Sequence, residues 1–486
     1  MRKKVLALAL CLGLGGLTAL PAPGSLAAGA SANPVYQVEV EDGTLNGVHA
    51  AQEAAGYSGS GYVTGFDQEA DSVIVSFNLE EEALYALTVG YRAPAGAKYA
   101  KISANDLPAG EIFLAETAEF AETSGGKLLL KAGANTIRFT NHWGWYDLDY
   151  IKLEKTEVSH IHRVTKKLSN PNASRQAKEL YRYLTRQYGK AILSGQQELE
   201  HVGWIELMTG KKPAIVGFDF MDYSPSRTER GAMTSATDEA LAWHRQGGIV
   251  TFTWHWNAPT GLIDEPGKEW WRGFYTEATT FDVQYALSHP ESEAYRLLIR
   301  DIDAIAVQLQ RLEDAKVPVL FRPLHEAEGG WFWWGAKGPE PAKELYRVLY
   351  DRIARHHGID NLIWVWNSID PSWYPGDDIV DIVSTDFYAG AGDHNPLIQP
   401  YERLIELARD NKVIALAENG PIPDPDLLTI YGAHWSWFLT WTGDFLTDGK
   451  YNSFEHLRKI YNHPYVITLD ELPVWRTQRF ESGSGH

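Results

Sequence analysis

The sequence predicts an α/β protein in which a C-terminal (β/α)₈ (TIM) barrel follows an all-β domain of the jelly-roll or β-sandwich type. A chain of 486 residues with 44% hydrophobic side chains is long and apolar enough to build two cores. Six short apolar runs, separated by glycine and turn residues, precede residue 156 without a helical pattern. Eight further apolar runs alternate with helical patterns after residue 174, as in parallel βα units.

Residues 1–32 predict a secretory signal peptide that belongs to neither domain. Three basic residues precede an apolar run from Val5 to Leu20, and small residues around Ala30 offer A-x-A cleavage sites. A membrane anchor is the alternative, but the run is shorter than the roughly 20 residues that a span needs. We therefore expect a secreted, extracellular protein. Since Cys11 is the only cysteine, the mature chain would depend on core packing or metal ions instead of disulfides.

The all-β domain is expected over residues 33–155. Its strand candidates alternate apolar and polar side chains between turn signals. They are residues 36–41, 72–79, 85–92, 127–130, 136–140 and 150–154. The polar stretch from Lys155 to Ser174 contains Asn170-Pro171 and predicts a linker.

The barrel is expected over residues 160–480. Its strand candidates are residues 191–197, 214–222, 248–257, 317–326, 362–368, 382–388, 413–418 and 435–441. Its helix candidates are residues 174–188, 237–246, 291–315, 341–356 and 401–411. In such a barrel the functional residues lie where strands end and βα loops begin.

Composition narrows the class of ligand. Acidic residues outnumber Lys and Arg by 63 to 44, and the formal net charge is −19. Binding a phosphate backbone needs a basic surplus, so we expect no nucleic-acid partner; we expect no membrane partner and a monomeric chain. The 18 Trp residues are an excess, and Trp often offers a flat ring to a ligand. A neutral or cationic substrate fits this composition.

Two strand ends carry carboxylates that can meet across the barrel mouth. The fourth strand candidate ends at Glu326 beside His325, and the seventh ends at Glu418. Retaining glycoside hydrolysis needs such a pair about 5 to 5.5 Å apart, one as nucleophile and one as acid and then base. The alternative is a pair of rim salt bridges, although carboxylates at apolar strand ends are costly to desolvate. Arg322 is expected on the same side of the strand as Glu326; it could instead hold Glu418 ionised or form a rim salt bridge.

Other hydrolase chemistries lack their motifs. His325-Glu326 would begin an H-E-x-x-H zinc helix, but position 329 is Gly and the pair ends a strand. The sequence contains neither G-x-S-x-G nor a phosphate-binding P-loop. We expect no cofactor for catalysis.

The segment Phe321 to Gly335, FRPLHEAEGGWFWWG, resembles the acid/base signature of glycoside hydrolase family 26, whose best-known members are endo-β-1,4-mannanases. The resemblance implies that Glu326 is the acid/base and that Glu418, in ALAENG, is the nucleophile. It implies supporting roles for His325 and Tyr388. The implied substrate-binding residues are His255, Trp256, Trp331, Trp334, Asp386 and Trp441. Ala327-Glu328 departs from the Met-Asn or His-Asn expected there, which puts leaving-group contacts in doubt.

The first domain resembles carbohydrate-binding module family 35 in three segments: YQVEVE from Tyr36, the glycine-rich Gly56 to Gly65, and NHWGWYDLDYI from Asn141. The resemblance implies a structural calcium site, and a pairing of the first and last strands could bring its oxygen donors together. A solvated acidic face is the alternative. The calcium ligands would be Glu39, Glu41 and Asp149, and the sugar-binding residues Asn141, Trp143 and Trp145.

Together these resemblances imply a secreted, retaining endo-β-1,4-mannanase acting on mannan, glucomannan and galactomannan. Two alternatives remain open. One is a related retaining β-glycanase acting on mixed-linkage glucan or β-1,3-xylan. The other is a non-catalytic polysaccharide-binding protein, which would be expected to have lost one of the two carboxylates.

Overall fold

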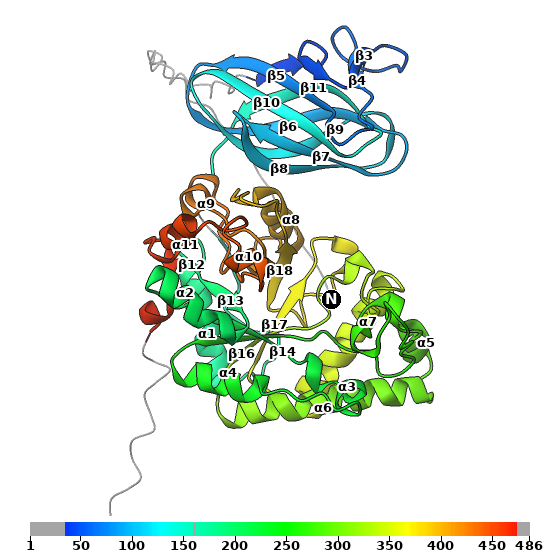
Figure 1. Ribbon diagram of the computed structural model, residues 1–486, viewed down its shortest axis with the longest axis vertical. Coiled ribbons are helices and arrows are strands. Elements are labelled where there is room, and N and C mark those ends of the chain that lie inside the picture. The colour runs from blue at the N-terminus through cyan, green and yellow to red at the C-terminus, as the bar shows by residue number, and fades with distance from the viewer. Residues whose placement is uncertain (1–34, 159–161, 474–486) are drawn as a thin grey trace, which may run out of the picture. The chain divides into compact units, whose positions relative to one another are not determined.

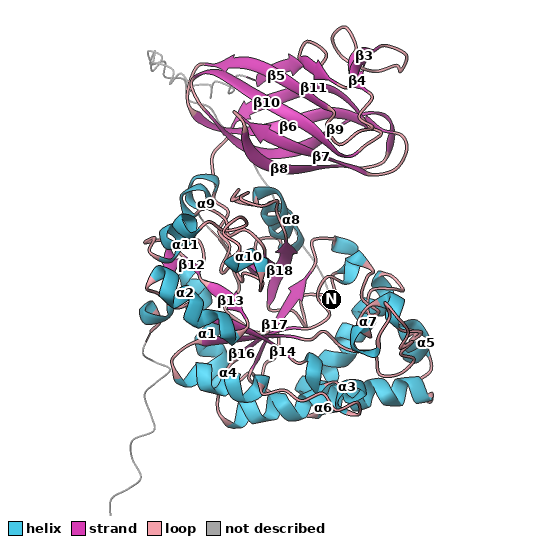
Figure 2. Cartoon of the chain, in the orientation of Figure 1, coloured by secondary structure: helices cyan, strands magenta, loops and turns pink. Residues whose placement is uncertain are grey.

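The computed structural model describes residues 35–158 and 162–473 (Figure 1). The expected signal peptide, with Cys11, lies outside the described residues. No helix in the two described ranges is long and apolar enough to span a membrane. The described chain contains an all-β domain followed by a domain in which strands alternate with helices (Figure 2).

The first domain is a sandwich of two antiparallel sheets. One sheet has the order β3-β4-β11-β6-β9, with β1 paired to β11; the other has the order β2-β5-β10-β7-β8. The strands are β1 (Val35–Glu39), β2 (Thr44–Asn46), β3 (His49–Ala51), β4 (Tyr62–Thr64), β5 (Ser72–Leu79), β6 (Ala83–Ala93), β7 (Lys98–Ala104), β8 (Leu107–Leu114), β9 (Thr117–Leu130), β10 (Gly133–Trp143) and β11 (Asp147–Lys155).

The six strands expected in this domain correspond to β1, β5, β6, β9, β10 and β11. The expected pairing of the first and last strands is confirmed, because Glu39 lies opposite Tyr150 in an antiparallel register. Five strands were missed. Three of them have only three residues, and β8 contains Pro108 and Gly110, which signal a turn in sequence. Pro108 is tolerated because β8 lies at the edge of its sheet.

The second domain is built on seven parallel strands in sequential order. They are β13 (Gly195–Gln197), β14 (Ile215–Asp219), β15 (Ile249–Thr253), β16 (Val319–Arg322), β17 (Leu362–Asn367), β18 (Ile382–Phe387) and β19 (Val413–Asn419). A separate parallel pair joins β12 (Ile192–Leu193) to β20 (Val466–Ile467). The strands are almost entirely buried, as expected for a parallel sheet covered by helices.

The eighth strand candidate, residues 435–441, is not a regular strand, yet it closes the barrel. Ser436 N–H donates to Ile414 O at 2.8 Å, and Trp441 N–H donates to Asn419 O at 2.8 Å, on the β19 side. On the β13 side, Leu193 N–H donates to Ser436 O and Thr440 N–H donates to Gly195 O. Segment 434–441 therefore joins the last strand to the first, and the expected (β/α)₈ barrel is confirmed in form.

Helices flank these strands (Figure 2). The five expected helices correspond to α1, α4, α6, α7 and α8, and α1 begins where expected because the Ser174 side chain accepts from Ala177 N–H. The helices are α1 (Arg175–Gln187), α2 (Val202–Thr209), α3 (Pro225–Thr228), α4 (Ala236–Arg245), α5 (Val283–Ser288), α6 (Glu293–Asp314), α7 (Pro339–Tyr350), α8 (Ile398–Ala408), α9 (Pro425–Tyr431), α10 (Asp444–Thr447) and α11 (Phe454–Tyr461).

Candidate active site

The segment after β16 turns sharply. The strand ends at Arg322 and not, as expected, at Glu326, and both Leu324 (φ 54°) and Glu326 (φ 52°) have a left-handed backbone. Pro323 has no N–H to donate to a neighbouring strand, so the ladder ends there. The expectation that Arg322 and Glu326 share one side of a strand is therefore wrong. Glu326 is presented by a turn.

The two predicted carboxylates do meet. Glu326, Asp386 and Glu418 each contribute a carboxylate oxygen to a group whose atoms all lie within 4.8 Å of one another. Glu418 comes from β19, Asp386 from β18 and Glu326 from the turn after β16. Glu418 is only 5% exposed. The expectation that Glu326 and Glu418 face each other is confirmed, although Glu326 lies on the turn after its strand and not at the strand end.

Arg322 compensates the charge of this group. It is 2% exposed, its Nη2 donates to Glu418 Oε2 at 2.6 Å, and its Nη1 contacts Asp386. Burial opposes the charged guanidinium, but the two carboxylates outweigh that effect and raise the pKa of Arg322. The Tyr388 hydroxyl donates to Glu418 Oε1. Both oxygens of Glu418 thus accept a hydrogen bond, which suits an ionised carboxylate.

Glu326 has a different environment. Burial, followed by repulsion from the Glu418 carboxylate, raises the pKa of Glu326. The indole N–H of Trp331 donates to Glu326 Oε2 at 3.0 Å and partly opposes this rise. The raised pKa favours the protonated form of Glu326, which is the form that a general acid needs.

A hydrogen-bonded row of side chains runs beside the pair. Asp219 accepts from His255 Nδ1 at 2.5 Å, and His255 Nε2 lies 3.2 Å from His325 Nε2. His325 Nδ1 lies 3.0 Å from Thr253 Oγ1. Burial and the nearby Arg322 charge hold the pKa of His325 well below its usual range. Burial lowers the pKa of His255, but Asp219 outweighs burial and raises it overall. A neutral His325 thus stands between Thr253 and His255.

The remaining predicted sugar contacts divide into exposed and buried side chains. Trp331 is 49% exposed, and Trp441 and His255 are partly exposed, so all three can meet a ligand. Three predictions are wrong. Trp256 and Trp334 are 0% exposed and belong to the core, where their indole N–H groups donate to Asp301 and to the His325 carbonyl. The Asp386 side chain is 1% exposed and contacts Arg322, not a distal sugar.

Asp219, Thr253 and Asn367 belong to the site but were missed from the sequence. Each ends an apolar parallel strand: β14, β15 and β17. The same signal singled out Glu418, so a search of every strand end for polar residues would have found them. Nine barrel tryptophans are less than 2% exposed, which shows that most of the tryptophan excess fills the core.

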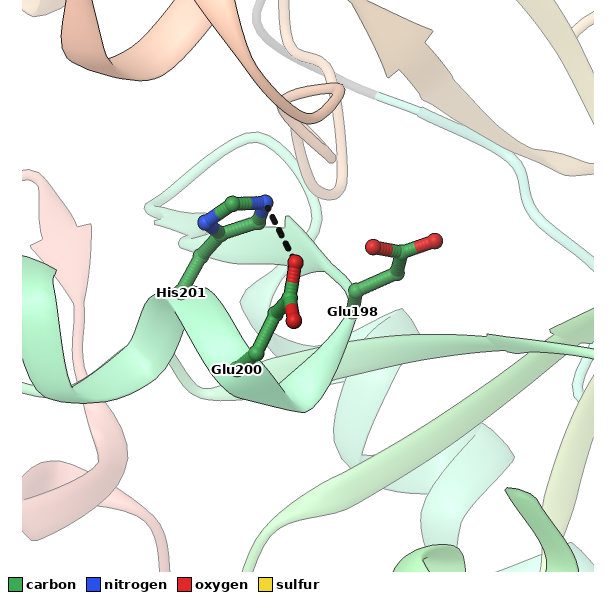
Figure 3. A group of neighbouring side chains, drawn as sticks. All are labelled: Glu198, Glu200 and His201. Atoms are coloured by element: carbon green, nitrogen blue, oxygen red, sulfur yellow. Dashed lines mark ion pairs between the residues drawn. The ribbon is translucent and has the colours of Figure 1, made fainter. Parts of the chain in front are cut away.

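A second cluster of ionisable groups follows β13. Glu198, Glu200 and His201 each offer a ligand atom, with all three atoms within 4.8 Å of one another. Figure 3 shows His201 beside Glu200, and His201 Nε2 lies 3.6 Å from Glu200 Oε1. Both glutamates are exposed. Burial nevertheless raises the pKa of Glu198, and Glu198 lines a cavity of about 440 Å³ together with Asp219, so the cluster lies next to the row of side chains beside Glu418.

The predicted sugar-binding loop of the first domain is open to solvent. Trp143 is 64% exposed and Trp145 is 69% exposed, and both line a cavity of about 430 Å³. Asn141 also lines this cavity but is 5% exposed; its Nδ2 donates to Gln68 O, while its buried Oδ1 has no hydrogen-bond partner in the structure. The loop therefore presents two ring faces to solvent, whereas the Asn141 amide oxygen lies buried behind them.

The predicted calcium ligands lie around a loop of serines and glycines. Ser58 Oγ donates to Glu39 Oε2 at 2.5 Å, Ser58 N–H donates to Asp149, and Ser60 N–H donates to Glu41 Oε1. Burial, with Glu39 and Glu41 adding repulsion, raises the pKa of Asp149 to about 6. Glu41 Oε2 is buried without a hydrogen-bond partner. Oxygen donors of this kind suit a hard cation such as Ca²⁺, but Glu39, Glu41 and Asp149 are not among the groups of described residues whose ligand atoms all lie within 4.8 Å of one another. A shared ion would therefore need the three carboxylates to move closer together.

Comparison with known proteins agrees with this arrangement. Residues 169–471 match the family model of glycosyl hydrolase family 26, and residues 36–156 match that of carbohydrate binding module family 35. The matched ranges begin and end within nine residues of the barrel expected at 160–480 and within three residues of the first domain expected at 33–155.

Individual relatives match over nearly the whole chain. A mannan endo-1,4-beta-mannosidase of Thermothelomyces thermophilus is 48% identical and aligns over 95% of this chain and 96% of its own length. A mannan endo-1,4-beta-mannosidase B of Piromyces sp is 34% identical and aligns over 94% of this chain and 80% of its own length. The crystal structure of a Podospora anserina GH26-CBM35 beta-(1,4)-mannanase is 51% identical, with a TM-score of 0.68, and covers 91% of this chain and 100% of that one. The chain therefore belongs to glycosyl hydrolase family 26 and carries a family 35 carbohydrate-binding module.

Proposed function

We propose that this chain is a secreted, monomeric endo-β-1,4-mannanase that cleaves internal bonds of mannan, glucomannan and galactomannan with retention of anomeric configuration. The observation that carries the proposal is the Glu326–Glu418 pair, whose nearest carboxylate oxygens lie within 4.8 Å in a family 26 chain. Retaining enzymes place the two carboxyl groups about 5 to 5.5 Å apart, whereas inverting enzymes leave about 6.5 to 9.5 Å for a water molecule. Relatives that match almost the full chain are named mannan endo-1,4-beta-mannosidases.

In the first step, Glu418 attacks the anomeric carbon while Glu326 gives its proton to the glycosidic oxygen, which leaves with the released chain. Burial and repulsion from Glu418 raise the pKa of Glu326, which favours the protonated form that this role needs. Arg322 and Tyr388 each donate a hydrogen bond to one oxygen of Glu418, so the nucleophile is oriented before the sugar arrives.

In the second step, water attacks the glycosyl–enzyme ester and restores Glu418. Because Glu418 is esterified in this intermediate, its repulsion of Glu326 disappears and Glu326 can ionise. Glu326 then removes a proton from the attacking water. His255 and Trp441 are placed to contact the sugar undergoing cleavage, and Trp331 binds Glu326 while leaving half of its surface exposed.

The first domain would hold the enzyme on its solid substrate. Trp143 and Trp145 offer stacking faces for pyranose rings, and binding there raises the local enzyme concentration on insoluble mannan. Glu39, Glu41 and Asp149 would bind a structural Ca²⁺ ion. Catalysis itself uses only side chains of the barrel. The acidic net charge suits a neutral polysaccharide and disfavours nucleic acid or an anionic membrane.

Rates on β-1,4-mannan, glucomannan, lichenan and β-1,3-xylan test the proposal, together with the anomeric configuration of the first product by NMR. We expect the two mannan-type substrates to be the best and the first product to be the β-anomer. Faster hydrolysis of lichenan or xylan would identify a related β-glycanase, and an α-product would rule out retention. Absence of hydrolysis on all four would favour a non-catalytic polysaccharide-binding protein.

A further inference from the structure

Asn367 is a buried amide at the end of β17, next to the proposed acid/base. It is only 2% exposed, which leaves almost none of its surface for direct contact with a sugar. Its side chain reaches two groups on β18 and one on the turn after β16. We propose that Asn367 is a positioning residue that fixes the backbone of Glu326 and links it to the nucleophile's ion pair, an inference that rests on the proposed function.

The first contact of Asn367 holds Glu326. Asn367 Oδ1 accepts from Glu326 N–H at 3.0 Å. Glu326 has a left-handed backbone with φ of 52°, which a residue with a Cβ rarely adopts unless its surroundings impose it. The other polar groups of Glu326 are also bound: its carbonyl accepts from Gly329 N–H, and Oε2 accepts from the Trp331 indole. Asn367 is thus the tertiary contact that fixes the start of this turn.

The second contact of Asn367 leads to Glu418. Asn367 Nδ2 donates to Asp386 Oδ1 at 2.8 Å, while the other oxygen of Asp386 contacts Arg322. Arg322 in turn donates to Glu418 Oε2 at 2.6 Å. One side-chain amide therefore connects the backbone of the acid/base to the ion pair of the nucleophile.

The orientation of the amide is fixed by its partners. Ser384 Oγ gives its proton to the Trp366 carbonyl and accepts from Asn367 Nδ2 at 3.2 Å. Turning the amide over would place its NH₂ against Glu326 N–H and its oxygen against the Asp386 carboxylate. Asn supplies an acceptor and a donor in one rigid plane, and no apolar residue of similar size supplies either.

Losing Asn367 would harm proton transfer more than sugar binding. The turn would no longer hold Glu326 within hydrogen-bond reach of the glycosidic oxygen, and general acid catalysis depends on that reach. A substrate whose leaving group departs without a proton does not need the acid. Azide, an anionic nucleophile, attacks the glycosyl–enzyme without a general base. With such a substrate and azide, the reaction therefore needs Glu326 neither as the acid in the first step nor as the base in the second.

The test compares Asn367→Ala with Asn361→Ala. Asn361 is a matched control, since it is 1% exposed, lies just before the other end of β17, and donates to a backbone carbonyl at 2.7 Å. We expect Asn367→Ala to lose about 100-fold in kcat on mannan with KM changed less than about threefold. With 2,4-dinitrophenyl β-mannobioside and azide, the loss should shrink to less than about tenfold, while Asn361→Ala should show no such difference between substrates.

Equal losses on both substrates, or equal behaviour of the two variants, would overturn the proposal. If Asn367→Ala does not fold, Asn367→Leu decides by the same substrate comparison, because it keeps a similar size but lacks the acceptor for Glu326 N–H. Wild-type rates on mannan are measured alongside. Inactive wild type would refute the proposed function, whereas active wild type with equal variant losses would refute only the role of Asn367.

Discussion

The two proposed sugar sites of this chain lie at opposite extremes of exposure. Around Glu418 the barrel places Arg322, His325 and Asn367 at 2% exposure or less, while the first domain leaves Trp143 and Trp145 more than 60% exposed. The charged groups of the barrel are fixed by each other, and they can act on a bond only because water does not screen them. Stacking on a polysaccharide instead needs open ring faces. The comparison teaches that chemistry and attachment require different degrees of burial.

The largest effect is expected from removing either carboxylate of the buried site. Glu418→Ala and Glu326→Ala should each lower hydrolysis of mannan by about 10⁴-fold or more. Melting temperature and binding to insoluble mannan should persist, because the open site does not depend on either residue. Initial rates, thermal melts and a pull-down on mannan check this. Retention of a tenth of the wild-type rate by either variant would contradict the assigned roles.

The next effect comes from removing the charge that compensates the buried carboxylates. Arg322→Met would leave Glu418 and Asp386 buried without a cation, and we expect a loss of about 3 to 5 kcal/mol in unfolding free energy. Arg347→Met is the control, since its ion pair with Asp378 is exposed and should contribute less than about 1 kcal/mol. Denaturant unfolding of both variants provides the comparison. Similar losses would mean that burial does not distinguish the two ion pairs.

Calcium should stabilise the first domain but leave the chemistry of the barrel unchanged. At a Ca²⁺ concentration about 100 times Kd, we expect roughly 2.7 kcal/mol of stabilisation. Without metal, the raised pKa of Asp149, about 6, means that stability is full at low pH and falls as pH rises from about 4 through 6. Removal of Ca²⁺ by a chelator should therefore lower the unfolding free energy of the first domain more at pH 8 than at pH 5.

Calorimetric melts with EDTA and with added Ca²⁺ measure this difference. Glu41→Gln should remove most of the response to Ca²⁺, because Glu41 supplies the orphaned oxygen. A response that is the same in wild type and Glu41→Gln would place the metal elsewhere.

Removing the two exposed tryptophan rings of the first domain should affect only attachment to the polysaccharide. Trp143→Ala/Trp145→Ala should weaken binding to insoluble mannan by about 2 kcal/mol, or about 30-fold, with kcat on short oligomers unchanged. Leu107→Ala is a matched control, as an exposed apolar side chain of the same domain that lies outside the Trp143 loop. Equal binding by the double variant and the control would show that the two rings do not bind the polysaccharide.

The smallest effect concerns two stacked histidines behind the nucleophile strand. His394 and His456 have ring centroids 3.5 Å apart, and both lie 2.9 Å from the Ile422 carbonyl, four residues after Glu418. Burial, then repulsion from His394, lowers the pKa of His456 to about 4, although Asp424 acts in the opposite direction and Lys459 adds to the lowering. Asp393 also faces His394.

Because the folded state keeps His456 neutral, its contribution is full above about pH 6.5 and is lost as pH falls toward 4. We expect about 1 to 2 kcal/mol of acid destabilisation in the barrel, opposite in direction to the metal-free first domain. His456→Gln keeps a neutral donor for Ile422 and should flatten the pH dependence of melting, while His289→Gln, at a partly exposed position, should not. If the melting temperature of His456→Gln depends on pH as strongly as that of the wild type, His456 is not the source of the acid destabilisation.

Much of the fold and the centre of the site followed from local sequence patterns. Apolar runs bounded by turn residues located seven regular barrel strands, and carboxylates at the ends of two runs identified Glu326 and Glu418. The same reasoning failed for Trp256 and Trp334. A tryptophan near a strand end has the same sequence signature whether it faces the core or a ligand, and only the packing of neighbouring strands and loops separates the two cases.

The sequence by itself therefore determined the order of the two domains, the identity of the proposed acid and nucleophile, and the aromatic loop of the first domain. Only the tertiary structure decided that Arg322 serves Glu418 and not Glu326, that Asp386 lies buried beneath the pair, and that Asn367 joins them. The physical reason is distance along the chain. Local patterns reflect contacts within an element, whereas the charge state and position of these side chains depend on partners brought together from strands 41 to 96 residues apart.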